Sequence, residues 1–349
     1  MNLLPDVRGK LAGIGAGALL VTAPANVRYL SGFTSPDDGV VVVTGERAAL
    51  LTDGRYTAQA AEESSIEVVI TSNWEEHLAE IVGDVRLAVE SEHLSLQRFR
   101  CIAERLGSEP MATEAFLAPF RLIKDANEIA RLREAARITD EAFENVVPML
   151  RPGVREIEVA LELERHMRLA GAGGSGFHII VASGLRSAMP HGVASNKTIE
   201  TGDLVTMDFG AVYEGYHADM TRAVAVGDID AELRRMFDAV LEAQEAALAA
   251  VAPGLTGKEL DRVARDLLAK HGLAEAFAHS LGHGTGLEIH EGPRLSTRSD
   301  DLLAPGMSVT IEPGVYVPGF GGVRIEDLAV VTDSGHEVLS RSPKGFRQV

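Results

Sequence analysis

Four acidic residues in the second half of the chain recur in two similar contexts. Asp208 and Glu312 occupy equivalent places in the β-rich runs 202–210 and 306–314, and a second acid follows each run after turn residues, Asp219 after the first and Glu326 after the second. This order predicts two hairpins that each direct two carboxylates towards a shared axis. Carboxylates gathered in an apolar cleft repel one another strongly, and hard divalent cations would compensate their charge.

A glycine-dense segment adds histidines to this set. His279, His283 and His290 lie within residues 279–291, where the glycines favour a loop or a strand over a helix. Glycines beside His283 would let the backbone approach a crowded centre closely. A single Asp or His is more often a hydrogen-bonded or solvated residue. Here, however, carboxylates and an imidazole follow the order of an internal repeat, which indicates a metal centre.

The elements that must position these residues form that degenerate repeat. Pro152 and Glu158 recur in the same order as Pro253 and Glu259, and each set opens a helix. The two β-rich runs with their acids follow these helices. Two similar halves would pack about a pseudo-twofold axis and leave between them a cleft to which both contribute residues.

The first third of the chain has a different pattern, typical of an α/β domain. Short β-rich runs alternate with helical stretches, and the expected strands cover residues 19–22, 39–44, 48–52 and 66–70. The pattern changes near residue 121, where Asp125 followed by Glu128 predicts a capping box at the start of a helix. We therefore expect a domain of residues 1–121 followed by a domain of residues 122–349.

Composition narrows the class of partner. The chain has 51 acidic and 33 basic residues and a formal net charge of −18, which disfavours nucleic acid or an anionic membrane as the main partner. Cys101 is the only cysteine, so no intramolecular disulfide or thiolate cluster can form. The apolar stretch 11–23 imitates a signal peptide, but Asp6 and three glycines weaken it, and it is too short to span a bilayer. We expect a cytoplasmic protein.

These motifs together resemble a known family. The order Asp208, Asp219, His283, Glu312, Glu326 resembles the five-ligand dinuclear site of pita-bread metallopeptidases. Further blocks resemble the Xaa-Pro peptidase branch and its extra N-terminal domain; they cover residues 190–192, 207–210, 279–291, 312–316 and 322–327, and residues 26–33 and 51–56 at the front. The resemblance implies an α+β architecture: a pita-bread catalytic domain with a pseudo-twofold repeat, preceded by a smaller creatinase-like α/β domain.

The resemblance also implies a role for each ligand. Asp219 and Glu326 would bridge two divalent metal ions, Asp208 would chelate one of them, and His283 with Glu312 would complete the other. We expect manganese, with cobalt and zinc as alternatives, because oxygen-rich ligation with one imidazole suits all three. Such ions would lower the pKa of water towards neutrality and polarise the scissile carbonyl, which makes attack by water at neutral pH possible.

Other residues would serve the substrate. Glu312 would also carry a proton from water to the leaving nitrogen. His191 and His290 would contact the substrate carbonyl and stabilise the oxyanion. His279 would line the proline pocket or act as a hydrogen-bonded supporting histidine, and Arg324 would bind Asp208 or a substrate carboxylate.

The expected reaction is hydrolysis of the Xaa-Pro bond in proline-containing dipeptides or short peptides. We favour an Xaa-Pro dipeptidase (prolidase), which must recognise the free carboxylate of a C-terminal proline. Arg47 and Arg55 of the N-terminal domain, from the same or a partner chain, are candidates for that task. The alternative is an Xaa-Pro aminopeptidase that acts on longer peptides. A symmetric homodimer is expected because it is the commonest oligomer.

Three more distant alternatives share the pita-bread fold. Methionine aminopeptidases usually lack a separate N-terminal domain, and creatinase-like amidinohydrolases do not use the metals. A non-catalytic scaffold that binds other proteins would be expected to have lost metal ligands. All five ligand positions are intact in this sequence, which favours the peptidase.

Overall fold

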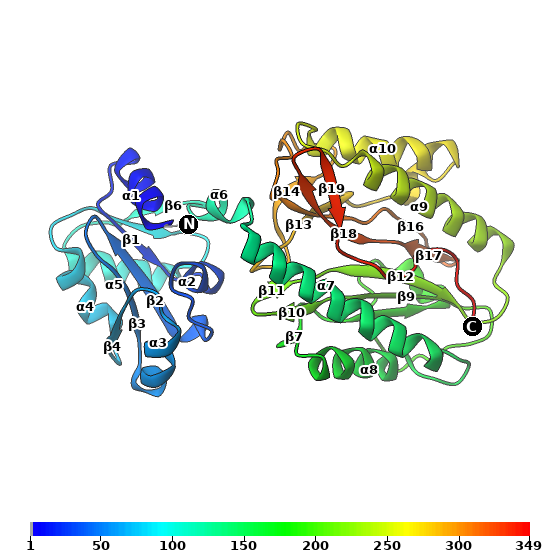
Figure 1. The fold of residues 1–349 in the computed structure, drawn as a ribbon, viewed down its shortest axis with the longest axis horizontal. Coiled ribbons are helices and arrows are strands. Elements are labelled where there is room, and N and C mark those ends of the chain that lie inside the picture. Colours follow the sequence, from blue (N-terminus) through cyan, green and yellow to red (C-terminus); the bar gives the residue numbers. More distant parts are fainter. Residues whose placement is uncertain (1–2) are drawn as a thin grey trace. The chain divides into compact units, whose positions relative to one another are not determined.

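A six-stranded mixed sheet forms the centre of the first of two compact units, which divide between Phe120 and Arg121. The structure is a computed structural model that describes residues 3–349, so residues 1–2 of the expected N-terminal domain lie outside the described part. The strand order is β4-β3-β2-β1-β5-β6 (Figure 1). The strands are β1 (Ala18–Val21), β2 (Gly39–Thr44), β3 (Ala48–Thr52), β4 (Glu67–Ile70), β5 (Leu87–Glu90) and β6 (Met111–Thr113).

Both faces of this sheet are buried. The helices of the first unit are α1 (Leu3–Gly13), α2 (Pro24–Ser31), α3 (Thr57–Glu63), α4 (Trp74–Val82) and α5 (Leu96–Leu106), and α6 (Ala118–Leu122) contains the division between the units. Leu19 packs with residues of α1 and α2, whereas Leu20 packs with residues of α4 and α5. Burial on both sides explains why these strands read as continuous apolar runs. The four strands expected from the sequence are confirmed to within one residue at each end.

Two pairs of long helices enclose the strands of the second unit. They are α7 (Ala126–Val146) with α8 (Glu156–Leu169), and α9 (Ala231–Ala250) with α10 (Gly257–Lys270). Figure 1 shows the two pairs on opposite sides of the strands. Each pair buries its own apolar core, one against β8 and β9 and the other against β15 to β18.

The strands of this unit form several small sheets. They are β7 (Gly174–Ser175), β8 (Ile180–Ser183), β9 (Leu204–Phe209), β10 (Ala211–Tyr213), β11 (Tyr216–His217), β12 (Met220–Ala225), β13 (Gly282–Gly284), β14 (Glu291–Leu295), β15 (Ser308–Ile311), β16 (Gly314–Val317), β17 (Gly321–Arg324), β18 (Asp327–Thr332) and β19 (Gly335–Val338). The strand orders are β11-β10-β7, β12-β9-β8, β13-β14, β15-β18-β19 and β16-β17.

The predicted duplication is visible in this unit. The antiparallel pair β9–β12 of the first half corresponds to the antiparallel pair β15–β18 of the second half. Helices α8 and α10 begin alike, since Glu158 accepts a hydrogen bond from the backbone N–H of Arg155 (2.8 Å) and Glu259 from that of Thr256 (2.8 Å). The capping box predicted at the start of α7 is also present.

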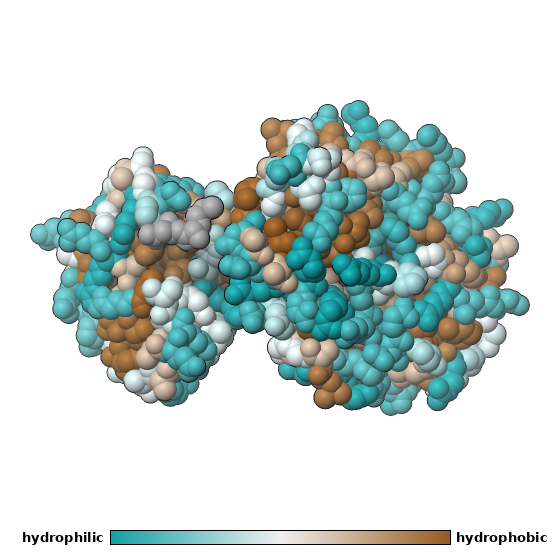
Figure 2. Space-filling view, viewed as in Figure 1, coloured by the Kyte–Doolittle hydropathy of each residue, from teal (hydrophilic) through white to brown (hydrophobic). Residues whose placement is uncertain are grey.

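Hydrophilic residues are frequent on the surface. On the face drawn in Figure 2, hydrophilic residues cover most of each unit, with smaller apolar areas between them. Within residues 3–349, none of the helices combines the length and the apolar character needed to cross a bilayer.

A buried ion pair ties the two hairpins together. The Arg222 guanidinium in β12 donates to the Asp327 carboxylate in β18 at 2.7 Å, and both side chains are 2% exposed. Lys344 and Gln244 also donate to Asp327, at 2.7 and 3.0 Å. Although burial raises the pKa of Asp327, the charges of Arg222 and Lys344 outweigh it and hold the pKa below the ordinary value.

Removal of one partner should therefore be costly. Asp327→Ala is expected to lower the free energy of unfolding by about 3–5 kcal/mol, because it leaves the Arg222 charge buried without its partner. The exposed pair Arg234–Asp238 offers a control, and Asp238→Ala should cost less than about 1 kcal/mol. Urea unfolding monitored by circular dichroism measures both, and equal losses would contradict the prediction.

Candidate metal centre

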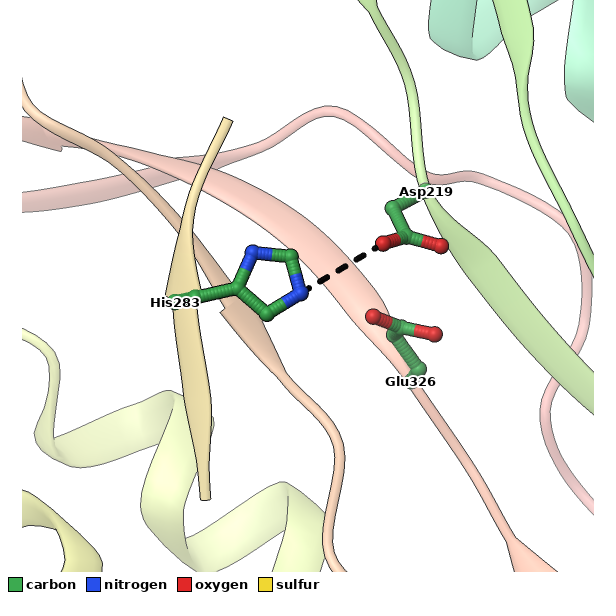
Figure 3. A group of neighbouring side chains, drawn as sticks. All are labelled: Asp219, His283 and Glu326. Carbon is green, nitrogen blue, oxygen red and sulfur yellow. Dashed lines mark ion pairs between the residues drawn. The ribbon is translucent and has the colours of Figure 1, made fainter. Parts of the chain in front are cut away.

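Two carboxylates and one imidazole converge at the centre of the second unit. Asp219 immediately precedes β12, His283 lies in β13, and Glu326 immediately precedes β18. Each offers a ligand atom, and these atoms lie within 4.8 Å of one another. Figure 3 shows the three side chains pointing towards a common space, with His283 Nε2 3.6 Å from Asp219 Oδ2. Segments from both halves of the repeat therefore meet at one place.

Glu312 and Asp208 adjoin this group. Glu312 follows β15, and its Oε1 lies 3.3 Å from His283 Nε2. Asp208 lies in β9, and its charge helps to raise the pKa values of Asp219 and Glu326. The structure thus brings all five candidate ligands into one neighbourhood. Their assignment as metal ligands stays a prediction.

The electrostatics of this group are dominated by burial. Burial raises the pKa of Asp219 well above its ordinary value, and the charges of Glu326, Asp208 and Glu312 raise it further. Burial also raises the pKa of Glu326, with Glu312 and Asp208 adding to the effect. For Glu312, burial raises the pKa from 4.5 to about 7 although Arg324 opposes the shift. Without added cations, the site therefore favours protonated carboxyl groups.

Unpartnered oxygens indicate how the site would hold cations. The buried atoms Asp208 Oδ1 and Glu326 Oε1 have no hydrogen-bond partner within residues 3–349. Buried polar atoms are nearly always satisfied, so such atoms need an explanation such as an ion. Several carboxylate oxygens and one imidazole form a donor set that manganese, cobalt and zinc all accept. The residues present therefore fit a divalent metal centre.

Two glycines allow β13 to carry His283 into this space. A Cβ on Gly282 would lie 2.0 Å from the carbonyl oxygen of Thr310, and a Cβ on Gly284 would lie 1.9 Å from that of Gly292. Real Cβ atoms do not approach so closely, so only glycine fits at either position. The expectation that glycines permit close backbone approach around His283 is confirmed.

Three further histidines are expected from the sequence to serve the substrate: His191, His279 and His290. The His290 ring lies edge-on to the His283 ring, with centroids 4.4 Å apart. His279 lies 3.1 Å from the Tyr316 hydroxyl and 2.8 Å from the Ser280 carbonyl oxygen, and burial lowers its pKa to about 4. The His191 side chain is exposed, and the carbonyl oxygen of the preceding residue, Pro190, accepts a hydrogen bond from Arg324 at 3.2 Å.

Arg324 is fully engaged within the site. Its guanidinium donates to Asp208 Oδ2 at 2.5 Å, to the Tyr316 hydroxyl at 2.6 Å and to Thr221 Oγ1 at 3.1 Å. Of the two partners considered from the sequence, the structure shows Asp208. Sequence reasoning missed the hydrogen bonds of these two hydroxyls. Tyr316 ends the block 312–316 and Thr221 lies two residues after Asp219, and neither position has a residue pattern that predicts a bond to Arg324.

Arg47 and Arg55 contact carboxylates of their own unit. Arg47 donates to Glu67 at 2.7 Å, and Arg55 donates to Asp38 at 2.8 Å and to Asp53 at 2.7 Å. Their side chains are 40% and 67% exposed. A role in binding a substrate carboxylate would require these arginines to exchange partners, and it stays a prediction.

The raised pKa values predict how stability without metal depends on pH. Three residues are easier to protonate in the folded than in the unfolded chain: Asp219, Glu312 and Glu326. Their contribution to the free energy of unfolding is therefore fully present below their ordinary pKa values and is lost as the pH rises through their raised ones. For Glu312 this loss occurs near pH 7. With a chelator present, the melting temperature Tm should decrease as the pH rises from 5 to 8. Added manganese should reverse this trend.

Differential scanning calorimetry at several pH values checks this expectation. Glu312→Gln, which cannot ionise at this position, should flatten the pH dependence in chelator. A chelated wild-type protein that is as stable at pH 8 as at pH 5 would contradict the electrostatic description of the site.

Comparison with known proteins supplies further findings. Residues 130–333 match metallopeptidase family M24, and residues 4–123 match the creatinase/prolidase N-terminal domain. The chain is 39% identical to an Xaa-Pro dipeptidase of Pyrococcus furiosus, over 93% of this chain and 94% of that protein.

Two solved structures are similar over nearly the whole chain. An Xaa-Pro dipeptidase from Bacillus anthracis is 45% identical with a TM-score of 0.96, over 99% of each chain. An X-Pro aminopeptidase from Thermotoga maritima is 40% identical with a TM-score of 0.91, over 98% of this chain and 100% of that one. These matches confirm the expected fold class, a pita-bread domain preceded by a creatinase-like domain.

Proposed function

Because the chain belongs to metallopeptidase family M24, we propose that it hydrolyses the bond before proline in Xaa-Pro dipeptides. The observation that carries this proposal is the convergence of Asp219, His283 and Glu326 in a buried site that fits divalent metal. The substrate class comes from the relatives named Xaa-Pro dipeptidase, which are similar to this chain along nearly its whole length.

Five residues of this chain would hold the metal: Asp208, Asp219, His283, Glu312 and Glu326. Divalent ions at such a site polarise the scissile carbonyl and lower the pKa of water towards neutrality. Arg324 would hold Asp208 in place through their 2.5 Å contact, and Thr221 would orient Glu326 through a 2.7 Å hydrogen bond. We propose manganese as the native metal, in agreement with the oxygen-rich donor set.

Proton transfer and charge stabilisation fall to groups around this centre. Glu312 would take a proton from the attacking water and deliver it to the proline nitrogen, which must leave as a secondary amine. His290, packed against His283, and His191 would donate to the carbonyl oxygen as its negative charge develops. His279, held by the Tyr316 hydroxyl, would form part of the wall around the proline ring.

Preference for dipeptides is the finer part of the proposal. A dipeptide presents its carboxylate next to the scissile bond, and a cation must bind it. Arg324 binds Asp208 and Tyr316 in the absence of substrate, and Arg324, Arg47 and Arg55 are the candidates for this task. The similarity to an X-Pro aminopeptidase keeps action on longer peptides as the second candidate function. We further propose a homodimer and, from the single cysteine, a reducing cytoplasmic compartment.

Removing a metal ligand should abolish both metal binding and activity, whereas removing a residue that contacts the substrate should lower activity alone. Asp219→Ala should lose bound metal and activity together, because it removes one of the carboxylates that would hold the metal. His290→Ala should keep its metal and lose about 100-fold in kcat, because His290 serves the transition state. Elemental analysis and steady-state kinetics distinguish the two variants.

The exposed His271 supplies a matched control. His271→Ala should retain both metal and activity. Activity in Asp219→Ala equal to that of the wild type would refute the metal assignment, and metal loss in His290→Ala would refute the assignment of His290.

Substrate length is tested with a graded panel. With manganese present, Ala-Pro should be cleaved at a higher kcat/KM than Ala-Pro-Ala, because only the dipeptide offers its carboxylate at the required distance. Liquid chromatography of the products measures both rates. Turnover of the tripeptide at an equal or higher kcat/KM would favour the aminopeptidase, and absence of cleavage of both with metal bound would favour a scaffold.

A further inference from the structure

The loop of residues 184–194, here called the His191 loop, connects β8 to the segment that begins at Ser195. We propose that Glu156, in the first turn of α8, is a positioning residue that holds this loop and so places His191 beside the metal centre. The inference rests on the proposed function, in which His191 contacts the substrate.

Glu156 joins both ends of the His191 loop. Its side chain is fully buried. Oε1 accepts hydrogen bonds from the backbone N–H and the hydroxyl of Ser183, at 2.8 and 2.9 Å. Oε2 accepts from the backbone N–H and the hydroxyl of Ser195, at 3.2 and 2.6 Å. One carboxylate therefore closes the base of the loop.

Arg186 extends this closure into the loop itself. Its guanidinium contacts Glu156 through Nη1 and donates through Nη2 to the carbonyl oxygen of Val193 at 2.8 Å. Arg186 and Val193 lie on the two sides of Pro190-His191-Gly192 in the sequence. The buried carboxylate thus acts on the part of the loop that flanks His191.

Two residues in the middle of the loop, Ser187 and Pro190, form hydrogen bonds with residues of β17. The Arg324 guanidinium donates to the carbonyl oxygen of Pro190 at 3.2 Å, and the backbone N–H of Gly322 donates to the Ser187 hydroxyl at 2.9 Å. Arg324 also binds Asp208. The residue before His191 is therefore linked to the candidate metal centre, while Glu156 fixes the base of the loop.

The cost of burying Glu156 supports a positional role. Removing a carboxylate from water is unfavourable unless hydrogen bonds satisfy it. The four serine donors and Arg186 satisfy it here, and they lie on the segments that define the loop. Replacing the carboxylate would leave the buried backbone N–H of Ser183 and the partly buried backbone N–H of Ser195 without an equivalent acceptor.

The second half of the repeat contains a comparable arrangement. Asp261 in α10 is 1% exposed, accepts from the backbone N–H of Leu281 at 3.1 Å and pairs with Arg265 at 2.6 Å. Arg265 donates to the carbonyl oxygens of Phe277 and His279, at 3.0 and 2.5 Å. In both halves, a helix-borne carboxylate and an arginine hold a segment that carries a site histidine.

A double-mutant cycle between Glu156 and His191 tests the proposal. Glu156→Gln should retain metal and lower kcat/KM for Ala-Pro by roughly 10-fold to 100-fold, because small displacements of a contact residue are costly. In a His191→Ala background, Glu156→Gln should cause no further loss of kcat/KM. A merely structural role would give the same loss in both backgrounds and would overturn the proposal.

Glu158→Gln is the matched control, since Glu158 lies on the same helix with its side chain 44% exposed. It should leave kcat/KM unchanged. If Glu156→Gln does not fold, Ser195→Ala, which removes only one hydroxyl donor, takes its place in the cycle with a smaller expected loss. Additive losses in that cycle would equally overturn the proposal.

Hydrogen exchange gives a readout that does not need activity. Exchange of the amides of residues 184–194 should accelerate in Glu156→Gln, or in Ser195→Ala, and not in Glu158→Gln. If the wild-type protein cleaves no Xaa-Pro substrate, the proposed function fails, whereas faster exchange still supports the role of Glu156 in holding the loop. Unchanged exchange overturns that role whatever the activity.

Discussion

The repulsion between buried carboxylates is the constraint on which the rest of the second unit depends. Burial raises the pKa values of Asp219, Glu312 and Glu326, and the negative charge of Asp208 raises all three further. Arg324 pairs with Asp208, but one guanidinium compensates at most one of four charges. Such a cluster is costly for folding alone. The cluster of four carboxylates is explained by binding of divalent metal ions, which supply the further positive charge in a metallopeptidase.

The duplicated architecture makes this concentration of charge possible. Each half contributes an antiparallel strand pair and a pair of covering helices, so apolar cores lie on both sides of the polar centre. Asp208 and Asp219 come from the first half and Glu312 and Glu326 from the second, so the carboxylates approach one another from opposite halves. The glycines beside His283 complete the arrangement, because any larger residue at either position would collide with neighbouring backbone.

Buried carboxylate–arginine pairs recur around the site. Asp327 with Arg222 joins the two hairpins, Glu156 with Arg186 closes the His191 loop, and Asp261 with Arg265 holds the segment before His283. Each pair has additional hydrogen bonds to backbone groups, which offset the cost of burial. These pairs form a supporting layer that orients short, irregular segments which regular secondary structure does not restrain.

Much of the fold and the candidate site could be predicted from the sequence, because the relevant signals are local or repeated. Strand runs and the capping boxes at Asp125 and Thr256 depend on residues that are close together in the chain, and the order of the acids on either side of His283 follows the internal repeat. Only the tertiary structure decided which groups support the site. Arg324 and Asp208 are 116 positions apart, and Tyr316 bonds to both His279 and Arg324. In the sequence, nothing distinguishes Glu156 from other helix residues. The folded structure shows that Ser183 and Ser195 donate hydrogen bonds to its carboxylate. Composition and spacing determine which chemistry is available, whereas long-range hydrogen bonds, which leave no periodic pattern, determine how it is held.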